Sequence, residues 1–380
     1  MEPIIYNHSK LPIENKIEQL YGCLSDVFGE KAIERLTITC DHLSYDTLNF
    51  TTSGIFHLHG FASIMKERLP WSIIVKVIKS DSAEKDQLEH HNYWRREALI
   101  FESKLLDELP DCIQAPKSYL VEEQQDGTIW LWMEHIVGQY ACSQHQFNFI
   151  ARQLGRFNGA YLNGRELPKQ EWICREWLKS WTTASQIYAP KSEAYIERLD
   201  KDNERSIWTW FQSFSQQLES NVSSLAKLPR VLAHQDLSQM NMLLVQDHNN
   251  KDGIVLIDWQ FMSISGVGED LGKMFGLTMG LGIIPSHQYD ALQSSLFDAY
   301  MLGLRDMGWQ GDERLARYGF CLATALRSVW EVPVYFSLAA QLQKEPHNTK
   351  LQVRVDQLEQ IIAIHRVMSV EADKLRALIM

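Results

Sequence analysis

The sequence predicts an α+β protein with a small β-rich part followed by a larger helical part. Up to about residue 135, short runs rich in Thr, Ile, Val and Phe are separated by turn residues, a pattern typical of antiparallel strands. Beyond Gly138, apolar residues recur at helical spacing almost to the C-terminus. We therefore expect two domains, residues 1–135 and residues 136–380, with a cleft between them where a ligand binds.

Composition and charge exclude several classes of function. The chain has 380 residues, of which 45% are hydrophobic and 22% charged, as in ordinary globular proteins. The formal net charge of −11 disfavours nucleic-acid binding, because phosphate contacts need a basic surface. The sequence shows neither a membrane span nor the apolar core of a signal peptide, and its six cysteines include no C-x-x-C pair. We expect a cytoplasmic protein that acts on a small molecule, with no membrane partner.

The N-terminal part begins with a helical pattern and continues with strands. The expected elements are a helix over residues 13–36, strands over 36–40, 48–52, 55–59 and 71–78, a helix over 87–109, and strands over 117–122 and 128–135. In the strand over 71–78, Lys76 shares one face with Ile74 and Ile78, while the other face is also apolar. A single lysine thus stands in a strand that is hydrophobic on both faces.

The C-terminal part is mainly helical. Ser143 and Gln146 have the spacing of a capping box, which predicts a helix start. Helical patterns then continue, notably over residues 315–342 and 351–379. Three short strands interrupt them, over residues 230–233, 241–245 and 254–258, with Asn249-Asn250 at the tip of a hairpin.

The most informative motif is the segment from His234 to Asn241, followed by Asp258 at the end of a predicted strand. Phosphoryl transfer needs one carboxylate to orient the acceptor hydroxyl and hard oxygen ligands to hold Mg²⁺ on the nucleotide phosphates. Asp236 fits the first role, and Asn241 and Asp258 fit the second. The alternative is structural: Asp236 and Asn241 would be turn or cap residues, and Asp258 would only end a strand.

These residues resemble the aminoglycoside phosphotransferase and choline kinase group of kinase-like enzymes. The resemblance is carried by a His-x-Asp-x-x-x-x-Asn loop, an Ile-Asp-Trp strand end and a Gly-x-x-x-Asp-Leu segment, here at His234–Asn241, Ile257–Trp259 and Gly266–Leu271. It is specific over residues 230–275 and can be traced from about residue 36. It implies a bilobal protein-kinase-like fold, with a nucleotide-binding N-lobe and a C-lobe that holds the catalytic loop and the acceptor site. It makes Asp236 catalytic, and Asn241 and Asp258 metal ligands. His234 and Asp270 would support the loop.

The same resemblance assigns residues in the N-lobe. Lys76 would contact the α- and β-phosphates, with Glu97 as its helix partner, and Glu134 and His135 would lie in the hinge that binds the nucleotide base. Ser53 and Gly54 would end a phosphate-covering turn over residues 49–54, although no G-x-G-x-x-G precedes Lys76 and a plain hairpin turn is the alternative. Lys76 could instead reach solvent, and Glu97 could be a solvated carboxylate with Glu89 and Glu102 as competitors. Gln235 stands where the family usually has Gly.

The resulting hypothesis is a kinase that moves the γ-phosphate of ATP or GTP, with Mg²⁺, to a hydroxyl of a small molecule. Asp258 and Asp270 are 12 residues apart, which leaves no room for a protein-kinase activation loop. The acceptor is expected to be an aminoglycoside or another antibiotic, with a role in antibiotic resistance; choline, a sugar or an amino alcohol is the alternative. A second alternative is a catalytically silent module that binds a nucleotide or a partner.

Acidic residues near the cleft would suit a polyamine sugar, and the candidates are Glu171, Glu176 and Glu331, with Arg327 one turn before Glu331. A basic or apolar cleft would instead favour an anionic or apolar acceptor. The histidine pairs His57/His59 and His90/His91 have no carboxylate or thiol at ligand spacing, so no zinc site is expected.

Overall fold

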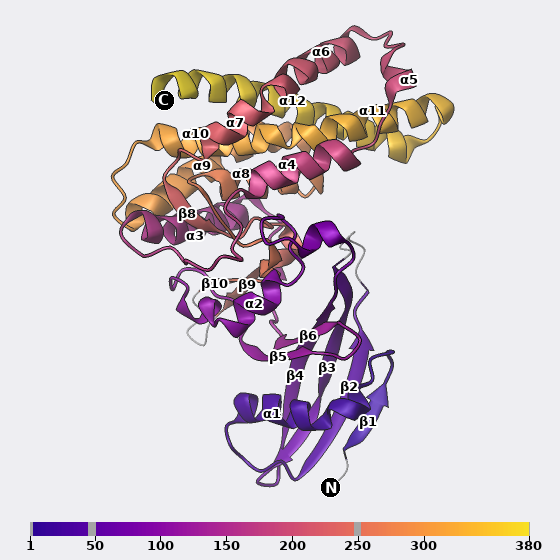
Figure 1. The fold of residues 1–380 in the computed structure, drawn as a ribbon, viewed down its shortest axis with the longest axis vertical. Coiled ribbons are helices and arrows are strands. Elements are labelled where there is room, and N and C mark those ends of the chain that lie inside the picture. Colours follow the sequence, from indigo (N-terminus) through magenta and orange to yellow (C-terminus); the bar gives the residue numbers. More distant parts are fainter. Residues whose placement is uncertain (1–2, 45–50, 247–251, 380) are drawn as a thin grey trace. The chain divides into compact units, whose positions relative to one another are not determined.

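The computed structural model describes residues 3–44, 51–246 and 252–379. The chain divides into two compact units, which we call the N-terminal unit and the C-terminal unit. The N-terminal unit comprises Met1–Leu88, Asn92–Gly138 and Val255–Gln260, and the C-terminal unit comprises Glu89–His91, Gln139–Ile254 and Phe261–Met380. The first is built on a mainly antiparallel sheet and the second is mainly helical, which confirms the predicted α+β class (Figure 1).

The sheet of the N-terminal unit has the strand order β1-β2-β3-β4-β6-β5. The strands are β1 (Ile4–Asn7), β2 (Arg35–His42), β3 (Thr52–Ile64), β4 (Glu67–Ile78), β5 (Ser118–Glu123) and β6 (Ile129–Glu134). β1 pairs with β2 in parallel, and the other neighbours are antiparallel. β1 is an addition to the predicted strands.

One face of this sheet carries the core of the N-terminal unit. Alternate residues of β2 and β3, such as Ile38 and Leu58, are fully buried, as the period of two in a strand requires. Helix α1 (Ile17–Phe28) adds the buried residues Leu20 and Leu24 to the same cluster. The opposite face carries Lys76, so the sheet separates the core from the polar groups described below.

Two predicted helices are shorter in the structure. The helix expected over 13–36 consists of a 3-10 turn, η1 (Ile13–Lys16), and α1, which ends at Gly29 with φ +74°. The helix expected over 87–109 consists of α2 (Arg96–Glu102) and a 3-10 turn, η3 (Leu105–Glu108), separated by Lys104 in the left-handed region. Apolar residues keep their helical spacing in the sequence beyond the point where the backbone leaves the helix. The spacing therefore overestimated the lengths of both helices. A further 3-10 turn, η2 (Ala83–Asp86), precedes α2.

The helices of the C-terminal unit agree broadly with the predicted pattern. They are α3 (Gln144–Leu162), α4 (Trp177–Tyr188), α5 (Glu193–Ile196), α6 (Asp202–Gln216), α7 (Leu218–Leu225), α8 (Glu269–Gly280), α9 (Tyr289–Asp306), α10 (Glu313–Leu326), α11 (Ser328–Lys344) and α12 (Thr349–Ile379). The predicted capping box is present at α3, where Ser143 accepts a hydrogen bond from the Gln146 amide. Among the described residues, no helix is both long and apolar enough to cross a membrane.

Two small sheets connect these helices to the motif segments. One has the order β10-β9-β7 and the other pairs β11 with β8. Their strands are β7 (Gln139–Tyr140), β8 (Arg230–Ala233), β9 (Met242–Gln246), β10 (Asp252–Leu256) and β11 (Ser263–Gly266). The hairpin tip predicted at Asn249-Asn250 lies outside the described residues. Short 3-10 turns complete the chain: η4 (Gln239–Asn241), η5 (Trp259–Phe261) and η6 (Ser286–Gln288).

Helices α3 and α9 touch backbone to backbone through two glycines. A Cβ added to Gly303 would lie 2.1 Å from the carbonyl oxygen of Arg152, and one added to Gly155 would lie 2.1 Å from the carbonyl oxygen of Tyr300. Real Cβ atoms cannot come this close to a backbone oxygen, so any side chain here would force the helices apart. The α3–α9 contact therefore depends on glycine at both positions.

We predict that Gly303→Ala lowers the free energy of unfolding by about 1–3 kcal/mol or more, because overpacking must separate α3 from α9. Gly22→Ala in α1 is the matched control, since a Cβ there meets nothing within 4 Å. That substitution is expected to stabilise by about 0.4–1 kcal/mol. Urea unfolding of both variants provides the measurement, and an unchanged midpoint for Gly303→Ala would contradict the close contact.

Candidate active site

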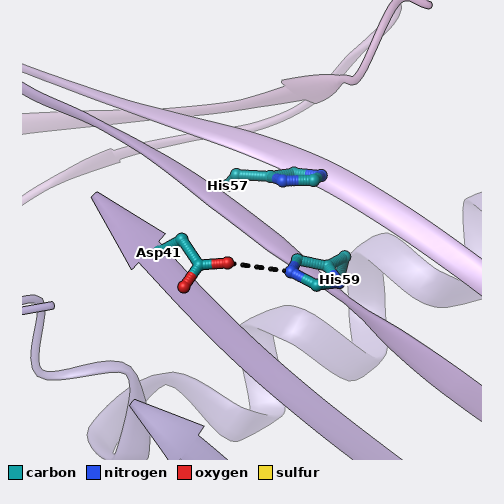
Figure 2. Close-up of side chains that lie close together, drawn as sticks. All are labelled: Asp41, His57 and His59. Carbon is teal, nitrogen blue, oxygen red and sulfur yellow. Dashed lines mark hydrogen bonds and ion pairs between the residues drawn. The ribbon is translucent and has the colours of Figure 1, made fainter. Parts of the chain in front are cut away.

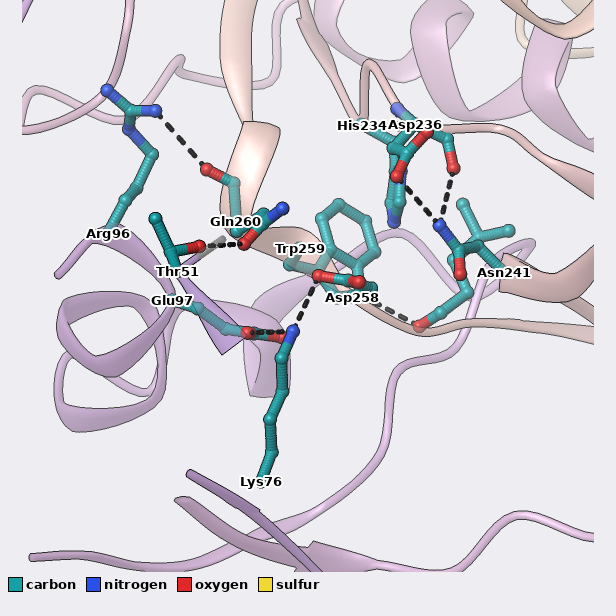
Figure 3. Close-up of polar contacts among 11 residues, drawn as sticks. Thr51, Lys76, Arg96, Glu97, His234, Asp236, Asn241, Asp258, Trp259 and Gln260 are labelled. Carbon is teal, nitrogen blue, oxygen red and sulfur yellow. Dashed lines mark hydrogen bonds and ion pairs between the residues drawn. The ribbon is translucent and has the colours of Figure 1, made fainter. Parts of the chain in front are cut away.

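The N-terminal unit buries a lysine between two carboxylates. Lys76 Nζ donates to Glu97 Oε2 at 2.6 Å and to Asp258 Oδ1 at 2.7 Å (Figure 3). Lys76 and Glu97 are 5% and 1% exposed, whereas the Asp258 side chain keeps 19% of its surface open. Burial opposes the charge on Lys76, but Asp258 and Glu97 together outweigh burial and raise the pKa of the ammonium above its usual value. Lys76 is therefore a fixed cation at neutral pH.

Three separate elements bring these side chains together. Lys76 lies on β4 and Glu97 in the first turn of α2, where a helix N-terminus favours a carboxylate. Asp258 follows β10 with φ +63°, a conformation that Asp tolerates better than most residues. The indole of Trp259 donates to the carbonyl of Leu256 at 2.8 Å and so closes this turn.

A buried arginine next to Glu97 secures the segment that carries Asp258. Arg96 is fully buried and donates through Nη1 to the carbonyl of Gln260 at 3.2 Å and through Nη2 to that of Leu88 at 2.9 Å. The side chain of Gln260 accepts from Thr51 Oγ1 at 3.4 Å. Sequence reasoning missed Arg96, because its position beside Glu97 in a helical pattern gave no sign of burial.

In the C-terminal unit, the loop after β8 is held by hydrogen bonds between its own residues. Asn241 Nδ2 donates both to the carbonyl of Asp236 and to Asp236 Oδ2, each at 3.0 Å (Figure 3). The Asp236 amide donates to His234 Nδ1 at 3.2 Å. Gln235 has φ +63°, so this position is left-handed although it is not glycine. The loop therefore presents the half-buried Asp236 carboxylate in a set orientation.

Asp270, in the first turn of α8, holds the start of this loop. Its two carboxylate oxygens accept from the amides of His234 at 2.8 Å and Gln235 at 2.9 Å. Burial raises the pKa of Asp270 to about 6, against the lowering effect of these two amides. Asp270 is therefore ionised above about pH 6, the state in which both oxygens accept hydrogen bonds.

The structure corrects the predicted phosphate-covering turn. Ser53 and Gly54 lie inside strand β3, where the pairing with β4 shifts between Thr52 and Gly54. They form a strand irregularity and not the end of a turn, because β3 starts earlier than the composition suggested. Residues 49 and 50 of the expected turn lie outside the described residues, as does most of the strand expected over 48–52.

The two predicted hinge residues lie at the end of β6. Glu134 is the last residue of this strand, and its carboxylate accepts from the Lys117 amide at 3.2 Å. His135 follows, with Nδ1 hydrogen-bonded to Ser72 Oγ at 2.7 Å. Burial lowers the pKa of His135, and His59 lowers it further.

A cluster of Asp41, His57 and His59 lies on the same sheet (Figure 2). One ligand atom from each lies within 4.8 Å of the others, and His59 Nε2 is 3.0 Å from Asp41 Oδ2. Burial lowers the pKa of His57 to about 4, with help from the neighbouring histidines, so its ring is neutral at pH 7. The expectation that these histidines lack a carboxylate was wrong, because Asp41 comes from the neighbouring strand opposite His57. These three side chains could hold a metal ion.

The acidic residues proposed for the acceptor side do not form an acidic wall. Glu171 and Glu176 are exposed, and Glu176 pairs with Lys179 at 3.0 Å. Glu331 is buried, and its Oε1 accepts from Arg327 Nη2 at 2.6 Å. The carboxylate expected to meet a polyamine is thus already neutralised by an arginine.

The fold and these residues define a kinase-like phosphotransferase. The sequence model of the phosphotransferase enzyme family matches residues 79–305, more than half of the chain. The protein belongs to this family. The match includes Asp236, Asn241, Asp258 and Asp270 and begins just after Lys76.

Several solved structures are similar to this chain, and the first of those named here shares its fold. Amicoumacin kinase hAmiN, in complex with AMP-PNP, Ca²⁺ and Ami, is 12% identical, covers 85% of this chain and 87% of its own, and has a TM-score of 0.51. An ethanolamine kinase of Plasmodium vivax is 11% identical, with coverages of 88% and 83% and a TM-score of 0.49. The GDP complex of aminoglycoside 2'-phosphotransferase-IIIa is 13% identical, with coverages of 92% and 99% and a TM-score of 0.46. No curated protein matches the sequence.

We predict that Lys76→Met lowers the free energy of unfolding at pH 7 by about 3–5 kcal/mol, because it leaves Glu97 buried without its cation. This loss of stability should shrink as pH falls, since the unpaired Glu97 carboxylate, whose pKa is raised by burial, takes up a proton in the folded state before it does so in the unfolded chain. Thermal unfolding between pH 5 and 8 measures this. Lys79→Met, at an exposed lysine just beyond β4, is the control; equal losses in both variants would refute the ion-pair argument.

Proposed function

We propose that this protein transfers the γ-phosphate of ATP or GTP, with Mg²⁺, to a hydroxyl group of a small molecule. The observation that carries the proposal is the buried Lys76, held by Glu97 and Asp258 at 2.6 and 2.7 Å. Such a fixed ammonium is suited to the α- and β-phosphates of a nucleotide. The amicoumacin kinase complex with AMP-PNP and Ca²⁺ and the aminoglycoside phosphotransferase complex with GDP agree with a nucleotide and a divalent metal.

The donor set fits a hard divalent cation. Asp258 uses Oδ1 for Lys76, which leaves its other carboxylate oxygen for a metal ion. Asn241 directs Nδ2 toward Asp236, so the opposite side of its amide presents an oxygen. Oxygen ligands of these two kinds are those that Mg²⁺ accepts, and bound Mg²⁺ would neutralise charge on the phosphates.

Asp236 would receive the proton of the acceptor. As the hydroxyl oxygen bonds to the γ-phosphorus, the bond from that phosphorus to the β-phosphate oxygen breaks and the nucleoside diphosphate leaves. The hydroxyl proton passes to Asp236, whose carboxylate is oriented by Asn241 at 3.0 Å. His234 and Asp270 take part only by holding the loop.

The acceptor is a small molecule in this proposal. Structural neighbours are named for amicoumacin, ethanolamine and aminoglycoside substrates, so an antibiotic or an amino alcohol are both within the range of the fold. A silent nucleotide-binding module is the competing function. The presence of Lys76, Asp236, Asn241 and Asp258 together favours catalysis.

We predict that the wild-type protein releases ADP or GDP with at least one compound of a panel of hydroxylated antibiotics, amino alcohols, sugars and hydroxy acids. Asp236→Asn should lower this rate by about 10²–10⁴-fold and leave nucleotide binding unchanged. Asp290→Asn, at an exposed position of α9, is the control. Nucleotide binding without turnover of any compound would identify the silent module, and full activity of Asp236→Asn would remove Asp236 from the mechanism.

A further inference from the structure

The face of the N-terminal sheet opposite the core carries three side chains of the kinds that bind metal ions. His57 and His59 are two residues apart on β3 and alternate with buried residues of the core, so both lie on the face away from it. Asp41 stands opposite His57 on the neighbouring strand β2. Residues opposite each other on paired strands share a side of the sheet, so the three side chains converge on one spot (Figure 2).

The donor atoms of these side chains are close enough to share one ion. One nitrogen or oxygen from each residue lies within 4.8 Å of the others, and His59 Nε2 is 3.0 Å from Asp41 Oδ2. Bonds of about 2.0–2.2 Å to a tetrahedral zinc ion place neighbouring ligand atoms about 3.4 Å apart. An ion that replaces the proton between His59 and Asp41 therefore needs a separation only about 0.4 Å greater.

Ser72, on the next strand, orients the ring of His57. His57 Nε2 and Ser72 Oγ are 2.6 Å apart, and Ser72 Oγ is 2.7 Å from His135 Nδ1. A hydroxyl has one proton, so it donates to one of these rings and accepts from the other. When Ser72 donates to His135 and accepts from His57 Nε2, the Nδ1 atom of His57 presents a lone pair. Among the described residues, this Nδ1 makes no hydrogen bond, and an imidazole held through its other nitrogen is the usual metal ligand.

Two imidazoles and one carboxylate favour a transition metal ion. Nitrogen ligands suit Zn²⁺, Cu²⁺ and Ni²⁺, whereas Mg²⁺ and Ca²⁺ bind through oxygen. The side chains of His59 and Asp41 keep 37% and 41% of their surface exposed, so an ion reaches them from solvent. Three protein ligands also leave one position of a tetrahedral ion for water, as in zinc sites that bind a further ligand.

The cluster is separate from the ion pairs of Lys76, although both lie on the same face of the sheet. The residues paired with the two histidines lie two and four positions before Lys76 on β4. At about 3.3 Å a residue, these positions are about 7 and 13 Å from Lys76 along the strand. An ion bound by the cluster is therefore a second metal, different in chemistry and place from the Mg²⁺ proposed at Asp258.

We propose that Asp41, His57 and His59 bind a zinc ion and that Ser72 positions His57 for this role. The ion joins β2 to β3, and water completes its coordination. The proposal goes beyond the phosphotransferase function and is independent of it, because none of these four residues is assigned to phosphoryl transfer.

Isothermal titration calorimetry of chelator-treated protein with Zn²⁺, in excess Mg²⁺, tests the site. Wild type should bind one zinc ion that Mg²⁺ does not displace. Ser72→Ala keeps all three ligands and should weaken zinc binding about tenfold, as the loss of an outer partner does. Asp41→Ala and His59→Ala each remove a ligand and should weaken it more, by about a hundredfold or more. His347→Ala, at an exposed histidine after α11, is the control and should bind zinc as wild type does.

Thermal unfolding of the same proteins separates loss of the ligands from loss of the fold. Without zinc, the two ligand variants should melt near wild type, because the half-exposed pair of Asp41 and His59 contributes little to stability. Zinc should raise the melting temperature of wild type and of the control but not that of the ligand variants.

The contrary results are equally specific. Equal zinc affinity in wild type and in the two ligand variants would place the zinc elsewhere and overturn the site. Displacement of zinc by Mg²⁺ would overturn the nitrogen ligation. Unchanged affinity in Ser72→Ala would overturn the positioning role of Ser72.

Discussion

The N-terminal unit depends on the burial of one positive charge. Lys76 is buried on β4 between the apolar residues Ile74 and Ile78, and a lone ammonium there would be strongly unfavourable. Glu97 and Asp258 make its burial possible, and each comes from a different part of the chain. Helix α2 and the turn after β10 must therefore both be in place before the lysine can be enclosed. Arg96 helps to hold the segment that carries Asp258, because it donates a hydrogen bond to the carbonyl of Gln260.

In the C-terminal unit, two buried charged side chains of α8 have partners other than side chains of opposite charge in direct contact. At Asp270 a buried carboxylate accepts hydrogen bonds from two backbone amides, whereas the ammonium of Lys273, one turn further along α8, lies 4.3 Å from the ring centre of Trp177 and is stabilised electrostatically by nearby carboxylates. One helix thus supplies both the carboxylate that supports the Asp236 loop and a buried lysine packed on tryptophan rings.

The sequence predicted the order of elements well, and it predicted which motif residues to examine. Runs of β-forming residues between turns located β2, β4 and β6, and the structure brings Lys76, Glu97 and Asp258 into contact; their catalytic roles stay predictions. The sequence could not reveal that Asp41 lies opposite His57, because strand register joins residues that are distant in the chain. It also could not show that Lys273 is buried against the tryptophans of α4 or that Glu331 is already paired with Arg327, since both depend on helix packing.

The N-terminal unit is discontinuous, since Val255–Gln260 belongs to it although more than a hundred residues of the C-terminal unit come between. During synthesis, the sheet and α2 leave the ribosome long before Asp258 does. Until then Lys76 has Glu97 as its partner but lacks its second carboxylate. A fragment that stops at Gly138 would retain this defect permanently. The small unit thus reaches its final state only after about half of the large one has been translated.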